Sequence, residues 1–210
     1  MKQTKSRAIL ALLVHILIPA LSAMAIAFFF LKGVVAVPGV EGAVCFRYFT
    51  IDANVVAALS CLAVLPSDIR ALRGMEPQQP VWAAKLRYIG TVVVTLTLLV
   101  VVCYLIPVEG AARMTTGSNL YLHLICPPLG IAAFLLLESG ELKKRDAWLG
   151  VLTALVYAVL YLLMVVILGK WPDFYRFNVN GTWPYFFTGL MAFTYLVSRL
   201  VVFFGNKVRK

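Results

Sequence analysis

Charged residues are scarce in this sequence, and their scarcity excludes a soluble protein. Lysine, arginine, aspartate and glutamate make up 13% of the 210 residues, whereas soluble domains carry about 25%. Hydrophobic residues make up 62%. In water such a chain would have more apolar surface than one core can bury, but in a bilayer that surface faces lipid at no cost. The length suits a single bundle over residues 1–210 and leaves no room for a second soluble domain.

Metal-binding and redox motifs are also missing. The four cysteines, Cys45, Cys61, Cys103 and Cys126, form no CxxC pair, so a zinc site is not expected. Each lies in or beside an apolar segment, where a free cysteine behaves as a small hydrophobe. Cys45 and Cys103 both fall near the expected outer surface, and a disulfide between them is left open.

Acidic residues are few, which gives a formal net charge of +10. A soluble protein with this charge would be a candidate for nucleic-acid binding. Here the lysines and arginines lie between apolar runs, where they set the topology and meet anionic lipid headgroups. We therefore expect membrane lipids as partners and no nucleic acid; the oligomeric state is left open.

Six apolar segments are each about long enough to cross a bilayer as a helix, which takes about 20 residues. They are Ala8–Leu31, Tyr48–Leu65, Tyr88–Ile106, Leu120–Leu137, Trp148–Leu168 and Pro184–Phe204. The expected fold is therefore all-α, a polytopic bundle of six transmembrane helices. The first segment also has features of a secretory signal. Because its apolar run continues to Leu31, we expect it to be retained as a helix.

The distribution of positive charge predicts the orientation. Of the 19 lysines and arginines, 13 fall in the two terminal segments and in the second and fourth connections, counting Arg87 with the second connection. Cytoplasmic loops carry the excess of lysine and arginine in membrane proteins. Both termini should therefore be cytoplasmic.

Polar residues at the start of the second span stand out against the apolar background. Thr50 and Asn54 are four residues apart and share a helix face, which Ala57 and Cys61 extend with small side chains. This face should point into the bundle, where small residues allow close packing. Alternatively, Thr50 caps the helix, with Asp52 in the first turn complementing the helix dipole.

The fourth span carries a histidine about one turn inside its outer boundary. Asn119 lies one turn from His123 on the same face. Pro127 and Pro128 have no N–H to give to the carbonyls one turn earlier, so the helix should bend or open at the histidine. An ionisable residue at membrane depth indicates a functional site. The alternative is a buried histidine satisfied by a neighbour.

The last outer connection is rich in aromatic residues, among them Trp183, Tyr185 and Phe186. An aromatic belt at the membrane interface explains them without a site. However, they fall at the same outer depth as Thr50 and His123. The convergence of three features on one layer predicts a pocket there.

These features together resemble a known family. The resemblance rests on Phe49-Thr50 with Asn54, on the Asn119-to-His123 segment with the proline after it, and on Trp183-Pro184-Tyr185-Phe186-Phe187. The family is that of the six-span androgen-induced and androgen-dependent TFPI-regulating proteins of animals, and the chain looks more like their short bacterial relatives. None of the motifs is long; their order and spacing against six spans carry the resemblance, which covers most of the chain.

The resemblance implies an intramembrane threonine hydrolase of a bacterial cytoplasmic membrane that cleaves lipid esters, such as fatty acid esters of hydroxy fatty acids, near the outer leaflet. By resemblance Thr50 is the nucleophile and His123 the base. In this chemistry Asn54 or helix-start N–H groups would steady the oxyanion, and Asn119, Asp52 or Tyr185 would orient the imidazole.

The expected pocket walls are Phe49, Tyr121, Trp183 and Phe186, and no metal or cofactor is needed. Two other functions stay open. One is a small transporter with Asp52 and His123 as proton-coupled groups, and the other is a non-catalytic membrane scaffold.

Overall fold

The computed structural model describes residues 5–32, 34, 36–138 and 142–208. Eight α-helices follow one another along the chain: α1 (Lys5–Ala27), α2 (Phe49–Leu72), α3 (Val81–Val100), α4 (Ile106–Glu109), α5 (Ala111–Thr115), α6 (Cys126–Leu136), α7 (Ala147–Leu162) and α8 (Trp183–Val208). Three π-helical turns, Val101–Leu105, Leu120–Ile125 and Leu163–Ile167, lie next to α3, α6 and α7. The described residues contain no β-strand, so the predicted all-α class is confirmed.

Five helical stretches are long and apolar enough to cross a membrane, and a shorter apolar stretch, Leu120–Leu136, corresponds to the predicted fourth span. The helix bounds differ from the predicted ones mainly at one end of the bundle. There α2 continues to Leu72 and α3 begins at Val81. These extensions carry the charged residues that a search for apolar runs leaves out, although such residues are good helix formers.

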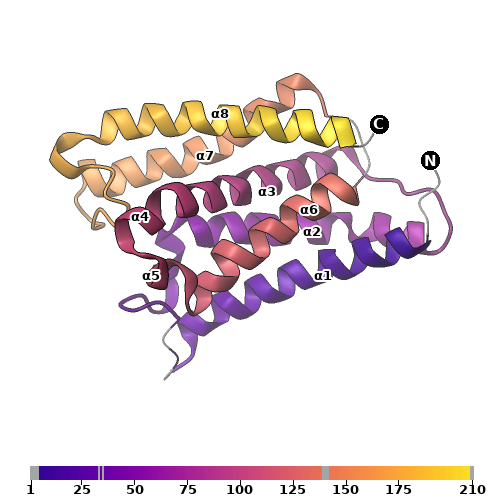
Figure 1. The fold of residues 1–210 in the computed structure, drawn as a ribbon, viewed down its shortest axis with the longest axis horizontal. Helices are drawn as coiled ribbons and strands as arrows, with labels where there is room; N and C mark the ends of the chain where they lie inside the picture. The colour runs from indigo at the N-terminus through magenta and orange to yellow at the C-terminus, as the bar shows by residue number, and fades with distance from the viewer. Residues whose placement is uncertain (1–4, 33, 35, 139–141, 209–210) are drawn as a thin grey trace.

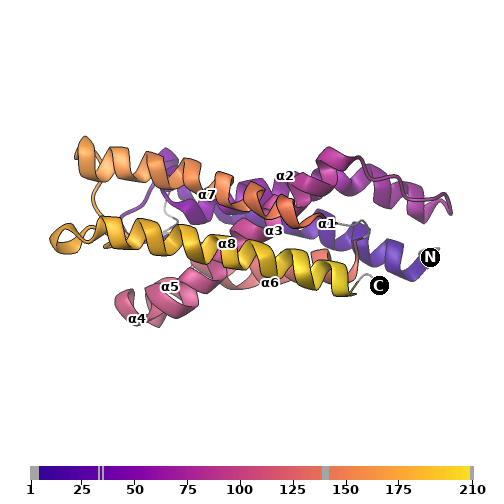
Figure 2. The same cartoon turned by 90° about the horizontal axis from the view of Figure 1, so that it is seen from above.

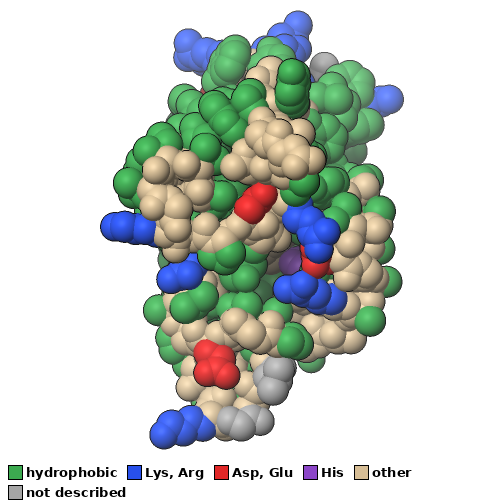
Figure 3. Space-filling model, turned by 90° about the vertical axis from the view of Figure 1, so that its left-hand side faces the viewer, with side chains coloured by type: hydrophobic (Ala, Val, Ile, Leu, Met, Phe, Trp, Pro, Cys, Tyr) green, Lys and Arg blue, Asp and Glu red, His purple; other side chains and the backbone are tan. Residues whose placement is uncertain are grey.

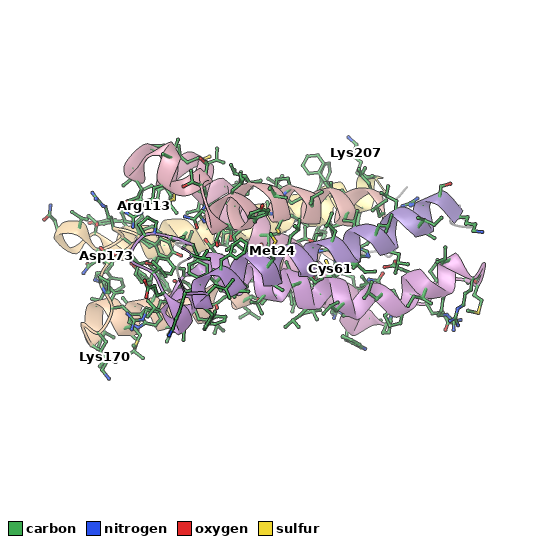
Figure 4. The ribbon with its side chains drawn as sticks, turned by 90° about the horizontal axis from the view of Figure 1, so that it is seen from below. Met24, Cys61, Arg113, Lys170, Asp173 and Lys207 are labelled. Carbon is green, nitrogen blue, oxygen red and sulfur yellow. The ribbon has the colours of Figure 1, made fainter. Side chains whose placement is uncertain are left out.

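Helix α3 is the centre of the bundle. It packs against α2, α6, α7 and α8, while α1 packs against α2 and α6, and this arrangement can be followed in Figures 1 and 2. The first residues of α1 and the last residues of α8 lie at the same end of the bundle (Figure 1). The start of α2 with Thr50, helix α5 with Arg113 and the connection with Asp173 lie at the opposite end, where Figure 4 labels Arg113 and Asp173.

Small residues let α2 and α3 approach closely, as the sequence predicts. Ala57 and Cys61 are buried on the same face of α2 as Asn54. Opposite them is Gly90 of α3, where an added Cβ would lie 3.0 Å from the Cα of Ala57. A side chain at this position would push the helices apart, which explains the glycine in mid-helix.

Candidate functional site

Thr50 lies in the first turn of α2, and its side chain is buried. The helix begins at Phe49 with Tyr48 as N-cap, and no side chain caps it. The alternative in which Thr50 is the cap is therefore wrong, although Asp52 does lie in the first turn. The Phe49 N–H instead donates to the hydroxyl of Tyr175 over 2.9 Å. Burial raises the pKa of Tyr175, so its hydroxyl is neutral where it accepts this bond.

The polar atoms of Thr50 are left available. Neither its backbone N–H nor its hydroxyl makes a hydrogen bond to any residue that the structure describes. The N–H is one of the donors that a helix start cannot satisfy internally. Thr50 therefore presents a free hydroxyl beside a free N–H at the positive end of the α2 dipole.

His123 lies in the π-helical turn Leu120–Ile125, where the paired prolines were predicted to open the helix. Its Nδ1 is 2.8 Å from the carbonyl oxygen of Met114. A carbonyl can only accept, so Nδ1 must carry a proton, and in the neutral imidazole Nε2 is then the unprotonated nitrogen. The Met114 carbonyl, which no sequence pattern indicated, is therefore the group that orients the imidazole.

The same π turn leaves the carbonyl of Leu122 without a helical partner. The N–H of Cys126 donates to the carbonyl of Tyr121, and Pro127 has no N–H, so neither can serve the carbonyl of Leu122. The amide of Asn54 takes this role. Its Nδ2 donates to the carbonyl of Leu122 over 2.9 Å and to that of Thr50 over 2.8 Å.

Asn54 is thus a buried bridge between the two chain segments that carry Thr50 and His123. Its side chain is fully buried. Both hydrogens of Nδ2 are engaged with carbonyls, so in this arrangement the amide has none to offer an oxyanion. Asn54 is placed to hold the segments together, and the free N–H of Thr50 is the better oxyanion donor.

Thr50 and His123 line one cavity of about 610 Å³, counting volume open to the surroundings, here called the polar cavity. Its floor and walls are aromatic and aliphatic, and its polar lining comes from Thr50, Asn119, His123, Glu109 and Arg113. Figure 3 looks onto this end of the bundle, where a histidine side chain is visible in a hollow beside basic and acidic side chains. The amide of Asn119 donates to the carbonyl of Arg113 over 2.9 Å, so Asn119 fixes the connection above the histidine rather than the imidazole itself.

Two loops meet over the polar cavity through ion pairs. Glu109 lies 2.7 Å from Arg113 and 2.9 Å from Arg176. Both arginines are at least half exposed, so these pairs contribute little to stability. The pair with Arg176 joins the end of α4 to the connection before α8 at the rim of the cavity.

The remaining predicted residues are spread over several places. Tyr185 is 81% exposed. It is absent from the lining of the polar cavity among the described residues. Asp52 is half-buried and also lies outside the lining of the polar cavity. The structure therefore does not bring Tyr185 or Asp52 to the imidazole.

The predicted pocket walls do not surround a single cavity. Phe49 lines a second cavity behind Thr50, whereas Trp183 and Phe186 line a third one between α7 and α8. Tyr121 packs against the buried cluster around Leu122. The four cysteines are free thiols, with Cys45 buried and Cys103 exposed.

A buried ionic cluster toward the other end of the bundle was missed by sequence reasoning. His15 Nδ1 is 2.7 Å from Asp68 Oδ2 and its Nε2 is 3.4 Å from Glu138 Oε1, while Arg87 Nε is 2.6 Å from the same Glu138 oxygen. Arg87 also donates to the carbonyl of Gly130 over 2.9 Å. The assignment of Arg87 to a connection was wrong, because its side chain is fully buried inside α3.

This cluster joins α1, α2, α3 and Glu138, the second residue after α6. The signal that could have found it is the set of charged residues just outside the predicted span ends, Asp68, Arg87 and Glu138, each able to find an opposite charge on a neighbouring helix. Asp68 is 18 positions after Thr50 on α2, or roughly 27 Å along a helix. The cluster is therefore separate from the polar cavity.

Comparison of the chain with protein-family models, with curated proteins and with solved structures gives no match in any of the three.

Proposed function

We propose that the protein is an intramembrane threonine hydrolase that cleaves lipid esters, with Thr50 as nucleophile and His123 as base. The observation that carries the proposal is that a free threonine hydroxyl and an unprotonated imidazole nitrogen line the same cavity. The family resemblance in the sequence supports the same pair. The mainly apolar lining suits a lipid substrate.

The first chemical step is acyl transfer to the threonine. His123 Nε2 takes the proton of the Thr50 hydroxyl as its Oγ attacks the ester carbonyl carbon. The tetrahedral intermediate then expels the alcohol, which leaves with the proton held by His123. The product is an acyl-threonine and a free alcohol.

Water completes the cycle by the reverse sequence. His123 takes a proton from water, the hydroxide attacks the acyl-threonine, and Thr50 leaves with the proton from the imidazole. The free N–H of Thr50 and the α2 dipole stabilise the oxyanion in both steps. Thr50 and His123 share no hydrogen bond in the described structure, so substrate must draw the two groups together, as often happens in hydrolases.

The proposed location follows from charge. We place both termini in the cytoplasm of a bacterial cell and the polar cavity at the outer leaflet of its cytoplasmic membrane. The end of the bundle with both termini carries most of the lysines and arginines.

A second candidate function is proton-coupled transport, and the buried cluster of His15, Asp68, Arg87 and Glu138 favours it. Ionisable groups inside a membrane bundle often form proton relays. In that case substitutions in the cluster would abolish activity, and substitution of Thr50 would not. Reconstituted vesicles with an internal pH dye would report proton movement.

The test of the hydrolase is a panel of lipid esters offered to the purified protein in detergent, without added metal. Thr50→Val removes the hydroxyl but keeps the shape, and it should lower turnover roughly 10⁴-fold or more. His123→Ala should lose about as much, because the two residues act as one unit. Thr50→Ser should retain measurable turnover.

Thr95→Val is the matched control. Its hydroxyl only bonds the carbonyl of Thr91 in its own helix, so turnover should equal that of the parent. If folded Thr50→Val hydrolyses esters like the parent, or the parent hydrolyses none of the panel, the hydrolase assignment is wrong.

A further inference from the structure

Thr50 lies at the junction of two cavities of different character. Behind it is a space of about 460 Å³, counting volume open to the surroundings, here called the apolar cavity, which shares Thr50, Leu105 and Tyr175 with the polar cavity. Leu96, Val100, Ala154 and Leu190 are typical of its lining, which comes from α2, α3 with its π turn, α7, α8 and the connection before α8. The polar cavity, in contrast, has charged groups at its rim. The two sides of Thr50 therefore offer different environments.

The apolar cavity adjoins a groove on the membrane-facing surface, here called the lateral groove. The groove has a volume of about 820 Å³ and lies between α3 with its π turn and α8. It shares Val100, Phe177 and Leu190 with the apolar cavity, so the two spaces adjoin at these side chains. Its outer edge is exposed, because Cys103 is exposed and Tyr185 is 81% exposed.

We infer that the apolar cavity and the lateral groove form the binding site for the acyl chain of the ester, which enters from the bilayer between α3 and α8. The inference rests on the proposed function. An acyl chain lying in this channel places its carbonyl at Thr50, and the alcohol half of the ester then lies in the polar cavity. The polar alcohol product leaves toward water, whereas the fatty acid returns sideways to the membrane.

The residues that line the two cavities support placing the alcohol half in the polar cavity and the acyl chain in the apolar cavity. The polar groups that serve the chemistry or can hold a polar alcohol, His123, Asn119, Glu109 and Arg113, all lie on the side of the polar cavity. In the described lining of the apolar cavity, hydroxyl groups come from Thr50, Thr97 and tyrosines only. The hydroxyl of Thr97 donates to the carbonyl of Val93. Each methylene that the channel buries should strengthen binding about fourfold.

Gly189 offers a way to close the lateral groove without straining the fold. It lines the groove on α8, and a Cβ added there meets no atom within 4 Å. Gly189→Phe therefore fills the groove. Leu196→Phe is the matched control, since it adds bulk to an exposed position two turns further along α8, outside the groove.

The kinetic test compares palmitoyl and butyryl esters of the same alcohol. Gly189→Phe should raise KM for the palmitoyl ester more than about tenfold, because at least two methylenes lose their site, and should leave the butyryl ester unchanged. Leu196→Phe should behave like the parent with both. An unchanged palmitoyl KM in Gly189→Phe, or an equal loss with both esters, would overturn the inference.

A second measurement does not depend on hydrolysis, which separates failure of the channel from failure of the proposed function. A palmitoyl ester with a photoreactive diazirine at the chain end is bound to Thr50→Val and irradiated. Crosslinks should map to Leu99–Tyr104 and to α8 near Gly189, and Gly189→Phe should remove them. Crosslinks elsewhere, or crosslinks that persist in Gly189→Phe, contradict the channel even if the parent hydrolyses esters.

Discussion

Replacing Asn54 should damage both stability and catalysis, because its amide ties the start of α2 to the turn that carries His123. Asn54→Ala leaves the carbonyl of Leu122 buried without a donor and removes the second bond to Thr50. An unsatisfied buried acceptor costs about 1–3 kcal/mol. The Oδ1 of Asn54 itself has no hydrogen-bond partner among the described residues. Its removal recovers part of the cost, so we expect the lower half of this range.

The effect on turnover should be larger than the effect on stability. We expect the hydrogen bonds of Asn54 to set the distance between Thr50 and His123. A misplacement of these two side chains by about 1 Å should lower kcat on the order of 100-fold, with little change in KM. Thermal unfolding followed by tryptophan fluorescence gives the stability, and initial rates on folded protein give kcat and KM. Asn54→Asp should be worse than alanine, because a carboxylate would face two carbonyl oxygens.

Asn206→Ala is the control for this prediction. Asn206 bonds both backbone groups of Leu142 at the other end of the bundle, so its loss should reduce stability and leave kcat unchanged. A folded Asn54→Ala protein with the kcat of the parent would refute the positioning role. An unchanged unfolding temperature would refute the hydrogen-bonded bridge.

Three further predictions concern the rest of the molecule. Glu138→Gln should destabilise the protein by about 3–5 kcal/mol, because it leaves Arg87 as a buried charge without its counterion. Thermal unfolding measures this change, and an effect below about 1 kcal/mol would contradict the buried pair. A reporter fused after Lys210 should be cytoplasmic, and an external reporter would overturn the charge-based orientation. Maleimide at pH 8 should label Cys103 before Cys45. Cys45 is buried, and burial raises its pKa and so lowers its thiolate fraction. Equal labelling rates of the two cysteines by mass spectrometry would argue against the burial of Cys45.

The sequence predicts the bundle well because lipid imposes a simple rule on it. A spanning helix needs a long apolar run, so the six spans can be read from composition. The opening of the helix at His123 was also predictable, since Pro127 removes a fixed donor from a known position. Local chemistry decides both features, and the structure agrees with them.

The parts that sequence could not supply depend on contacts between distant segments. Nothing near His123 in the chain shows that the Met114 carbonyl receives its Nδ1, or that Asn54 would serve Leu122. Tyr185 was expected at the site from its depth and from the resemblance, but neither fixes the direction of a side chain around the helix. The ionic cluster at Arg87 was missed because a charge near a span end usually reaches water.

The central claim is tested most directly by labelling with a fluorophosphonate probe and mapping the adduct by mass spectrometry. The probe phosphonylates a hydroxyl that an adjacent base activates. We expect a single adduct at Thr50, absent in Thr50→Val and strongly reduced in His123→Ala, with Thr95→Val labelled like the parent. An adduct on another residue, or labelling of Thr50 that does not depend on His123, would contradict the proposed catalytic pair.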